Sequence, residues 1–166
     1  MTMSSGARRG VVVAAISCCA AVGTASADTR FDWPLAPRPH VERVFDKPAE
    51  NWLPGHRGAD LGGSAGQPVL AAGEGIVAFA GVVAGKPTVS IDHSGGLRTT
   101  YEPVVADVRA GERVAAGAVI GTLESGHEGC VVAACLHWGV RRGREYLDPL
   151  GLVRTQPLRL KPLRDG

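Results

Sequence analysis

Short runs of β-branched and apolar residues, separated by glycines, fill the middle of the chain. Residues 66–120 contain five of them, at 69–71, 76–79, 88–91, 97–104 and 119–120. Runs of this length and composition are typical of strands, and the glycines between them are typical of turns. The pattern predicts a mainly β fold, with a small antiparallel sheet and few helices.

Two turn signals and one internal similarity add detail to this fold. The S-G-G sequence at 94–96 lies between two predicted strands and favours a hairpin, because glycine adopts the positive φ of tight loops. The D-P pair at 148–149 predicts a single helical turn. The segments AGQPVLAAGEGI at 65–76 and AGERVAAGAVIG at 110–121 resemble each other. This similarity favours a duplicated β-hairpin unit, and the alternative is coincidence in a chain rich in alanine and glycine.

The first 27 residues have the pattern of a secretory signal peptide. Two arginines precede an apolar run at 11–22, and A-S-A at 25–27 provides the small residues of a cleavage site. About 12 apolar residues fall short of the roughly 20 that span a bilayer, so no membrane span is expected in the mature chain. The alternative is lipid attachment at Cys18 or Cys19. Either way, we expect a secreted or cell-wall associated protein.

The rest of the chain divides into three parts, and its charge balance excludes one class of partner. We predict an extended N-terminal segment at 28–50, one domain at 51–153 and a basic tail at 154–166. The sequence has 18 Lys and Arg against 16 Asp and Glu, and residues 1–27 hold two of the arginines and no acidic residue. The mature chain is therefore neutral overall, whereas a nucleic-acid-binding domain normally has a basic excess. We expect no nucleic-acid partner.

The predicted mature chain keeps two cysteines, Cys130 and Cys135. An even pair in an exported protein predicts a disulfide. The four residues between them have to form a turn and include neither glycine nor proline. The spacing is therefore compatible with the bond without requiring it.

Candidate metal ligands occur in two short motifs. In GHRGADLGG, three residues separate His56 from Asp60, and the surrounding glycines predict a sharp turn that aims both side chains at one point. A lone pair of this kind is a weak signal. A third donor, His137, follows on a predicted strand in CLHWGV, and the three residues together predict a metal site.

These motifs resemble those of the lysostaphin-type zinc endopeptidases, which cut peptidoglycan cross-links. The resemblance rests on HRGADLGG, VSIDHSGGLRTTYEPV, VRAGERVAAGAVIG, CLHWGV and YLDPL in this order, and it covers roughly residues 32–152. It implies a duplicated β motif with a groove above a small antiparallel sheet. It also implies Zn²⁺ bound by His56, Asp60 and His137, and hydrolysis of an amide bond by zinc-bound water. The implied partners are peptidoglycan stem or cross-bridge peptides.

The sequence departs from the family pattern at both catalytic histidines. The first histidine of the family's H-x-H motif, which handles the proton of the attacking water, falls on Cys135, and the histidine of its Tyr-x-His motif, which stabilises the oxyanion, falls on Pro103. General acid–base catalysis contributes about 10² to 10⁴ in rate, and one oxyanion donor about 10² to 10³. The chain is thus either a zinc peptidase with an unusual base or a catalytically impaired, zinc-bearing module that binds cell wall or regulates another hydrolase.

Two residues are candidates for the missing base. Glu102 is a carboxylate, but it lies one position from the family's histidine, and strand alternation predicts that it points the other way. His127 lies on the loop that leads to Cys130, from which it can swing toward the metal, especially if a Cys130–Cys135 disulfide fixes that loop. The alternative for His127 is an exposed loop histidine.

Overall fold

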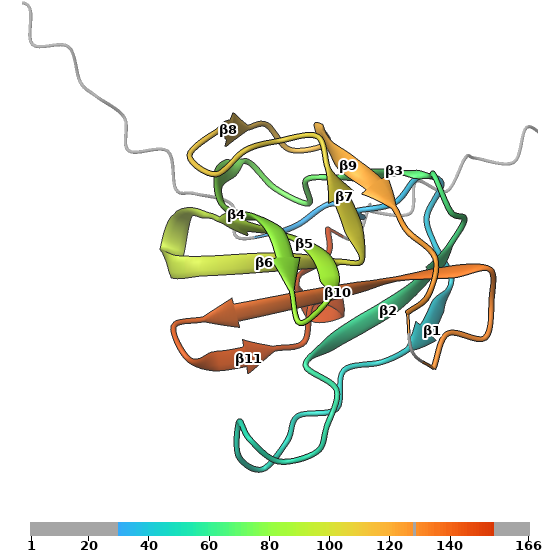
Figure 1. The fold of residues 1–166 in the computed structure, drawn as a ribbon. Helices are drawn as coiled ribbons and strands as arrows, with labels where there is room; N and C mark the ends of the chain where they lie inside the picture. Colours follow the sequence, from blue (N-terminus) through green and yellow to red (C-terminus); the bar gives the residue numbers. More distant parts are fainter. Residues whose placement is uncertain (1–29, 128, 155–166) are drawn as a thin grey trace, which may run out of the picture.

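The computed structural model describes residues 30–127 and 129–154, and their strands form two antiparallel sheets (Figure 1). The predicted signal peptide, Cys18, Cys19 and residues 155–166 of the predicted tail lie outside the described residues. The strands are β1 (Val41–Arg43), β2 (Gly58–Gly63), β3 (Pro68–Leu70), β4 (Gly75–Val83), β5 (Lys86–Asp92), β6 (Leu97–Glu102), β7 (Val104–Ala106), β8 (Arg113–Val114), β9 (Val119–Leu123), β10 (Ala134–Arg142) and β11 (Glu145–Leu147). The larger sheet has the order β1-β2-β10-β6-β5-β4-β8 with β11 paired to β10, and the smaller sheet has the order β3-β9-β7. The predicted mainly antiparallel β fold is confirmed.

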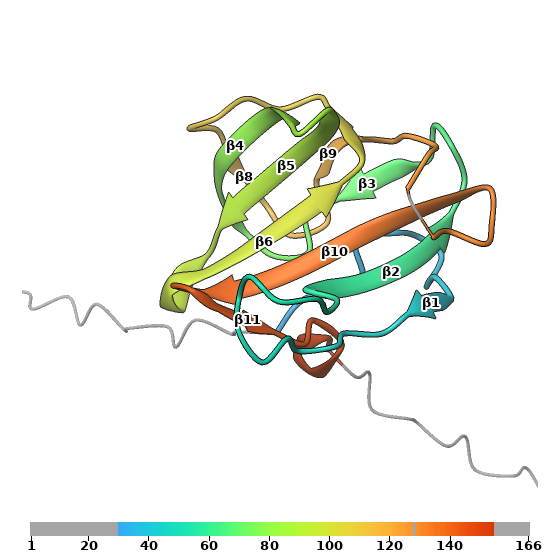
Figure 2. The same cartoon turned by 60° about the horizontal axis from the view of Figure 1, so that its bottom comes forward.

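Strand β10 crosses the larger sheet between β2 and β6, where it contributes to both the core and the outer face (Figure 2). Leu136, Trp138 and Val140 are buried in the core. Because side chains alternate along a strand, His137 points to the opposite face of the sheet. The antiparallel register places His137 opposite Asp60 on β2 and opposite Glu102 on β6.

The core lies between the larger and the smaller sheet and includes part of the predicted N-terminal segment. Phe31 and Leu35 are almost completely buried, and the Phe31 ring packs edge-on against Trp138 at 6.2 Å. The hydroxyl of Tyr101 accepts hydrogen bonds from the Ala72 amide at 2.9 Å and from the Thr99 hydroxyl at 3.0 Å. Burial of the phenol raises the pKa of Tyr101 to about 12. These contacts hold β6 and β10 at fixed positions beneath the outer face.

The strands predicted from the apolar runs are observed, and so are the turns predicted at the S-G-G sequence and the D-P pair. All five apolar runs form strands, and the fourth is divided into β6 and β7 at Pro103. The S-G-G sequence is a 3-10 turn between β5 and β6, and a second 3-10 turn at Leu150–Leu152 follows the D-P pair. The described residues include no helix with the length and hydropathy of a membrane span.

The sharp turn predicted for the glycine-rich H-x-x-x-D segment is wrong, because Gly58–Gly63 is strand β2. Its glycines serve close packing instead of a turn. A Cβ at Gly58 would lie 2.5 Å from the Trp138 carbonyl oxygen, and a Cβ at Gly63 would lie 2.8 Å from Leu123 Cδ2. The contact at Gly58 is with backbone that cannot move aside, so that position requires glycine, whereas the contact at Gly63 is with a side chain that can shift.

The two similar segments, 65–76 and 110–121, occupy equivalent positions in the fold, and the strands of each pair with those of the other. The first provides β3 and the start of β4, the second provides β8 and the start of β9, and β3 pairs with β9 while β4 pairs with β8. In the first segment the amide of Gly66 donates to Leu123, which donates back to Gln67; in the second, Gly111 donates to Val77, which donates back to Glu112. This repeated bonding supports the duplicated hairpin unit.

Candidate metal centre

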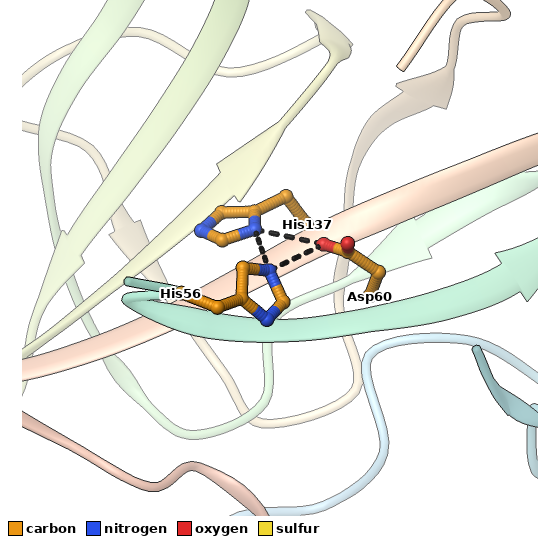
Figure 3. A group of neighbouring side chains, drawn as sticks. All are labelled: His56, Asp60 and His137. Carbon is orange, nitrogen blue, oxygen red and sulfur yellow. Dashed lines mark hydrogen bonds and ion pairs between the residues drawn. The ribbon is translucent and has the colours of Figure 1, made fainter. Parts of the chain in front are cut away.

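Three side chains from neighbouring elements converge on the outer face of the larger sheet (Figure 3). Asp60 and His137 lie directly opposite each other on β2 and β10. His56 precedes β2, where its backbone forms an isolated bridge with Asp46 through hydrogen bonds of 2.8 and 2.9 Å. The ladder and the bridge fix all three backbones, so the cluster is built into the sheet.

The potential ligand atoms lie at hydrogen-bond distance from one another. His56 Nε2 is 3.0 Å and His137 Nδ1 is 2.8 Å from Asp60 Oδ1, and the two histidine nitrogens are 3.1 Å apart. His56 and Asp60 are buried, with 5% and 4% of their surface exposed. The structure therefore brings together the three predicted metal ligands, and His137 is the most exposed of them.

The hydrogen bond of the His56 ring to the backbone favours a cation at the centre of this cluster. Its Nδ1 lies 2.7 Å from the Val44 carbonyl oxygen and donates to it. In the neutral ring, Nε2 then carries a lone pair that faces the Asp60 carboxylate. Two lone pairs at 3.0 Å repel unless a proton or metal ion lies between them. A histidine oriented by a backbone carbonyl in this way is typical of metal sites.

The electrostatics of the cluster keep Asp60 ionised. Burial raises the pKa of Asp60, but the hydrogen bond with His137 and the charges of His127, His137 and His56 together outweigh it and lower the pKa. An ionised carboxylate is the form that binds a divalent cation.

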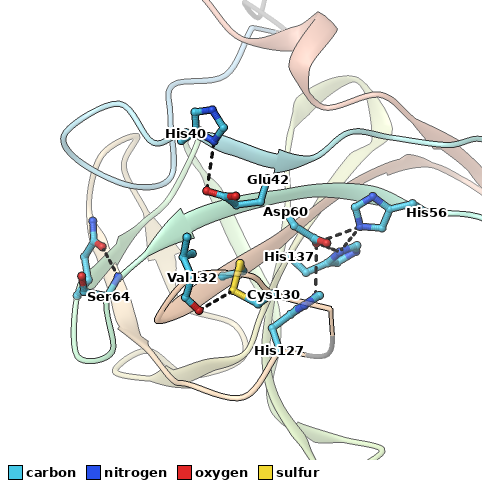
Figure 4. The surroundings of a disulfide bond; sticks show 11 residues. His40, Glu42, His56, Asp60, Ser64, His127, Cys130, Val132 and His137 are labelled. Carbon is cyan, nitrogen blue, oxygen red and sulfur yellow. Dashed lines mark hydrogen bonds and ion pairs between the residues drawn. A yellow bond between two sulfur atoms is a disulfide. The ribbon is translucent and has the colours of Figure 1, made fainter.

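His127 is a third histidine at this cluster (Figure 4). Its Nε2 lies 3.4 Å from Asp60 Oδ1, and its ring stacks on that of His137 with the centroids 5.8 Å apart and the planes at 15°. Only 9% of the side chain is exposed. His127 thus lies at the cluster, although neither a sequence motif nor its distance along the chain from Asp60 predicts that position.

The predicted disulfide joins Cys130 to Cys135 and anchors the end of the loop that carries His127. The bond closes a span of five residues, with the Cα atoms 5.7 Å apart. Cys135 lies two residues before His137 on β10, so both side chains point to the same face. The bond therefore ties the chain three residues after His127 to the outer face beside His137.

Glu102 lies on the same face as His137, in contrast to the direction predicted from strand alternation. Residues opposite each other in a ladder share a face, and Glu102 is the β6 partner of His137. Its carboxylate is engaged by Lys86 Nζ at 3.0 Å and by the Thr88 hydroxyl at 3.5 Å. Pro103 is buried at the end of β6 and contributes no polar side chain to the site.

A groove of about 540 Å³ passes over the cluster. Two of the candidate ligands line it, the buried His56 and the half-buried His137. The other residues of the lining are Arg43, Gly55, Arg57, Lys86, Glu102, His127 and Gly129. This groove above the sheet agrees with the one that the resemblance implies.

Comparison with known families identifies the class of protein. The model of peptidase family M23 matches residues 54–149, more than half of the chain. The chain therefore belongs to this lysostaphin-type metallopeptidase family, as its motifs predicted.

Individual relatives agree with this assignment. The chain is 56% identical over 155 residues to the uncharacterized protein Rv2891 of Mycobacterium tuberculosis, which covers 89% of this chain and 62% of that protein. It thus spans less than two thirds of the length of this relative. Helicobacter pylori Csd3 matches with a TM-score of 0.62 and 26% identity over 80% of this chain and 37% of that chain. A zinc-containing peptidase from Vibrio cholerae matches with a TM-score of 0.61 and 21% identity over 73% of this chain and 39% of that chain, which shows the fold alone.

Proposed function

We propose that this chain is a zinc-dependent endopeptidase that hydrolyses an amide bond in peptidoglycan stem or cross-bridge peptides, and that His127 is its proton-transfer residue. The observation that carries the proposal is the position of His127 at the cluster, with its Nε2 3.4 Å from Asp60 Oδ1. Without such a residue, the replacement of the family's histidine by Cys135 would favour an inactive relative. Membership of family M23 supports the substrate class.

The three ligand atoms fit a tetrahedral zinc ion. Ligands at the usual zinc distances of about 2.0–2.1 Å lie about 3.3 Å apart at tetrahedral angles. The separations of 2.8 to 3.1 Å between His56, Asp60 and His137 require only small adjustments to reach that value. When bound, zinc would polarise the amide carbonyl and lower the pKa of a coordinated water to about 7.

His127 would move the proton during hydrolysis. Its Nε2 faces the cluster from the groove side, and the stacked His137 ring restricts the orientation of the imidazole. From there Nε2 takes a proton from the attacking water and returns it to the leaving amine, as a histidine general base does. The disulfide keeps the imidazole within reach, which contributes to catalysis by positioning.

Glu102 is assigned no proton transfer, because the Lys86 ammonium ion holds its carboxylate. Pro103 leaves the oxyanion without the donor that the family places there, which removes about 10² to 10³ in rate. We therefore expect a slower enzyme than family members with both histidines.

Export supports the same function. Disulfides persist in oxidising compartments, and the chain combines a disulfide beside the cluster with a predicted signal peptide. We propose that the mature protein is secreted or cell-wall associated, on the side of the membrane where peptidoglycan lies.

The alternative function is a zinc-bearing module that binds cell wall or regulates another hydrolase, which Pro103 and Cys135 favour. Release of soluble peptides from purified peptidoglycan by the zinc-loaded protein distinguishes the two. We expect His137→Ala to lose both zinc and activity, and His127→Ala to keep zinc while activity falls by about 10² or more. His40→Ala is the matched control, because His40 is 82% exposed and pairs with Glu42. If the wild type binds zinc and peptidoglycan but releases no peptide, the protein is the module.

A further inference from the structure

The groove over the metal centre continues along the sheet beyond His137. A second hollow, lined by Thr100, Gly139, Val140, Arg141 and Tyr146, shares Arg57, Glu102 and His137 with the first. The two hollows therefore form one groove that extends to both sides of the cluster. A chain bound across the cluster would contact both of them.

The floor of the groove beyond His137 has no bulky side chain. Gly139 follows His137 on the outer face of β10, and a Cβ added to it would meet the Arg57 carbonyl oxygen at 3.3 Å. Thr100 lies opposite Gly139 on β6. Gly139 is itself buried with the Arg57 main chain against it, so Arg57 and Thr100 form the surface of the hollow at this point.

The described lining of this groove carries four cations and one carboxylate outside the metal cluster. The cations are Arg43, Arg57, Lys86 and Arg141, and the carboxylate is Glu102. Lys86 and Glu102 neutralise each other in an ion pair of 3.0 Å. Three arginines therefore remain without a carboxylate partner in the lining.

The hydrogen bonds of these arginines leave their charge in place. Arg57 donates to the carbonyl oxygens of Asn51 and Leu53, and Arg141 donates to that of Gly143. A carbonyl partner orients a guanidinium ion without neutralising it.

Outside the lining, Asp92 interacts with Arg141, and its carboxylate is already engaged. The Arg98 hydrogen bonds, and more weakly the Arg141 charge, lower the pKa of Asp92. The carboxylate accepts two hydrogen bonds from Arg98, one of them at 2.7 Å, so it offsets the Arg141 charge only in part. The residues 30–127 and 129–154 are close to neutral as a whole, so the cations of the groove mark a local concentration of positive charge.

We propose that this groove selects acidic peptides: substrates with free carboxylate groups on both sides of the bond over the metal centre. Arg43 would contact a carboxylate on the His127 side, and Arg141 one on the Tyr146 side. Guanidinium ions bind carboxylates through two parallel hydrogen bonds, and a groove lined by one sign of charge concentrates ligands of the other sign. The inference rests on the proposed function, since it specifies the substrate at the same site.

Binding of two peptides that differ only in charge tests the inference. The probes are a fluorescently labelled tetrapeptide with free carboxylates and the same peptide with every carboxylate converted to carboxamide. Fluorescence anisotropy with the full-length, zinc-loaded protein gives the two dissociation constants, and chromatography of the same samples reports cleavage separately.

We expect the acidic peptide to bind about tenfold more tightly than the amidated peptide at low ionic strength, from two partly exposed ion pairs. The preference should decrease with added salt. In Arg43→Gln/Arg141→Gln it should fall to about twofold or less. The control is Arg113→Gln, which removes an exposed arginine on edge strand β8 outside the groove and should keep the full preference.

Equal affinity for the two peptides in the wild type would overturn the inference, and so would an unchanged preference in Arg43→Gln/Arg141→Gln. Undetectable binding of the acidic peptide would also overturn it. Preferential binding without cleavage would contradict the proposed function and support the charge selection. Cleavage without charge preference would do the reverse.

Discussion

Removal of the disulfide between Cys130 and Cys135 tests most directly how His127 is held at the metal cluster. The perturbation is the double variant Cys130→Ser/Cys135→Ala. Cys135 is completely buried, so alanine is the replacement there, because a serine hydroxyl would cost about 1–3 kcal/mol if left without a partner. Cys130 is partly exposed and accepts serine.

The loss of stability follows from the short span of the bond. Closing a loop with a sequence separation of five removes only a small amount of entropy from the unfolded chain. The loop-closure relation gives about 2 kcal/mol for such a span. We expect the free energy of unfolding to fall by about this amount while the variant stays folded, since β10 remains paired with β2 and β6.

The loss of activity should be larger than the loss of stability suggests. Without the bond, the loop is no longer tied to β10, and His127 is within reach of Asp60 for only part of the time. We expect peptide release to fall by about 10² or more, toward the rate of His127→Ala, because both variants remove the same proton transfer. Zinc content should stay at the wild-type level, since His56, Asp60 and His137 are fixed by the sheet.

Three measurements on the double variant check this reasoning: denaturant unfolding, metal analysis and peptide release from purified peptidoglycan. His127→Ala with the disulfide intact provides the reference rate. Wild-type activity in the double variant, alongside an inactive His127→Ala, would refute the positioning role of the disulfide. Loss of zinc in the double variant would refute the independence of the metal cluster from the loop.

Three further predictions concern the sheet beneath the site. Gly58→Ala should weaken zinc binding and lower the free energy of unfolding by more than about 1 kcal/mol, because its Cβ would lie 2.5 Å from the Trp138 carbonyl oxygen and 2.8 Å from His137 Nε2; metal titration and denaturant unfolding measure both. Trp138→Ala should destabilise the protein by about 3–5 kcal/mol in the same unfolding assay, since the side chain is completely buried. Burial lowers the pKa of His93 below 6.5, so the unfolded chain binds more protons and stability should fall as the pH drops below about 6.5. Unfolding measured at several pH values should show a smaller decrease for His93→Gln.

The sequence was sufficient to predict the features that depend on local pattern. The apolar runs predicted the strands, and the H-x-x-x-D motif with His137 predicted the cluster, because strands in register bring such residues together. The direction of Glu102 was predicted incorrectly, since counting residues from the family's histidine does not give the register of β6 against β10. The sequence pattern alone makes the glycines of β2 resemble turn residues, because the close approach of Trp138 to Gly58 is not visible in the sequence.

The sequence left two positions open for His127, at the metal or exposed on its loop, and the reason is physical. In the described residues of the loop 125–133, no strand pairing fixes the backbone. The loop is anchored by the bond from Cys130 to Cys135, a residue on the face of β10 that also carries His137. The spacing of metal-ligand motifs does not predict a histidine whose loop is anchored to the sheet by a disulfide. The even pair of cysteines was the feature of the sequence that indicated this anchor.

This arrangement links the proposed chemistry to the compartment. Two histidines of a strand-borne H-x-H motif would point to one face of the sheet without any cross-link. In this chain the sheet positions the three candidate metal ligands, while the disulfide anchors the loop of His127, the proposed proton-transfer residue. Disulfides are rare where glutathione and thioredoxin keep thiols reduced, so the reduced protein would carry the metal cluster without a positioned His127. On the proposed function, hydrolysis would therefore begin only once the chain has reached an oxidising compartment, which is where the predicted signal peptide would deliver it.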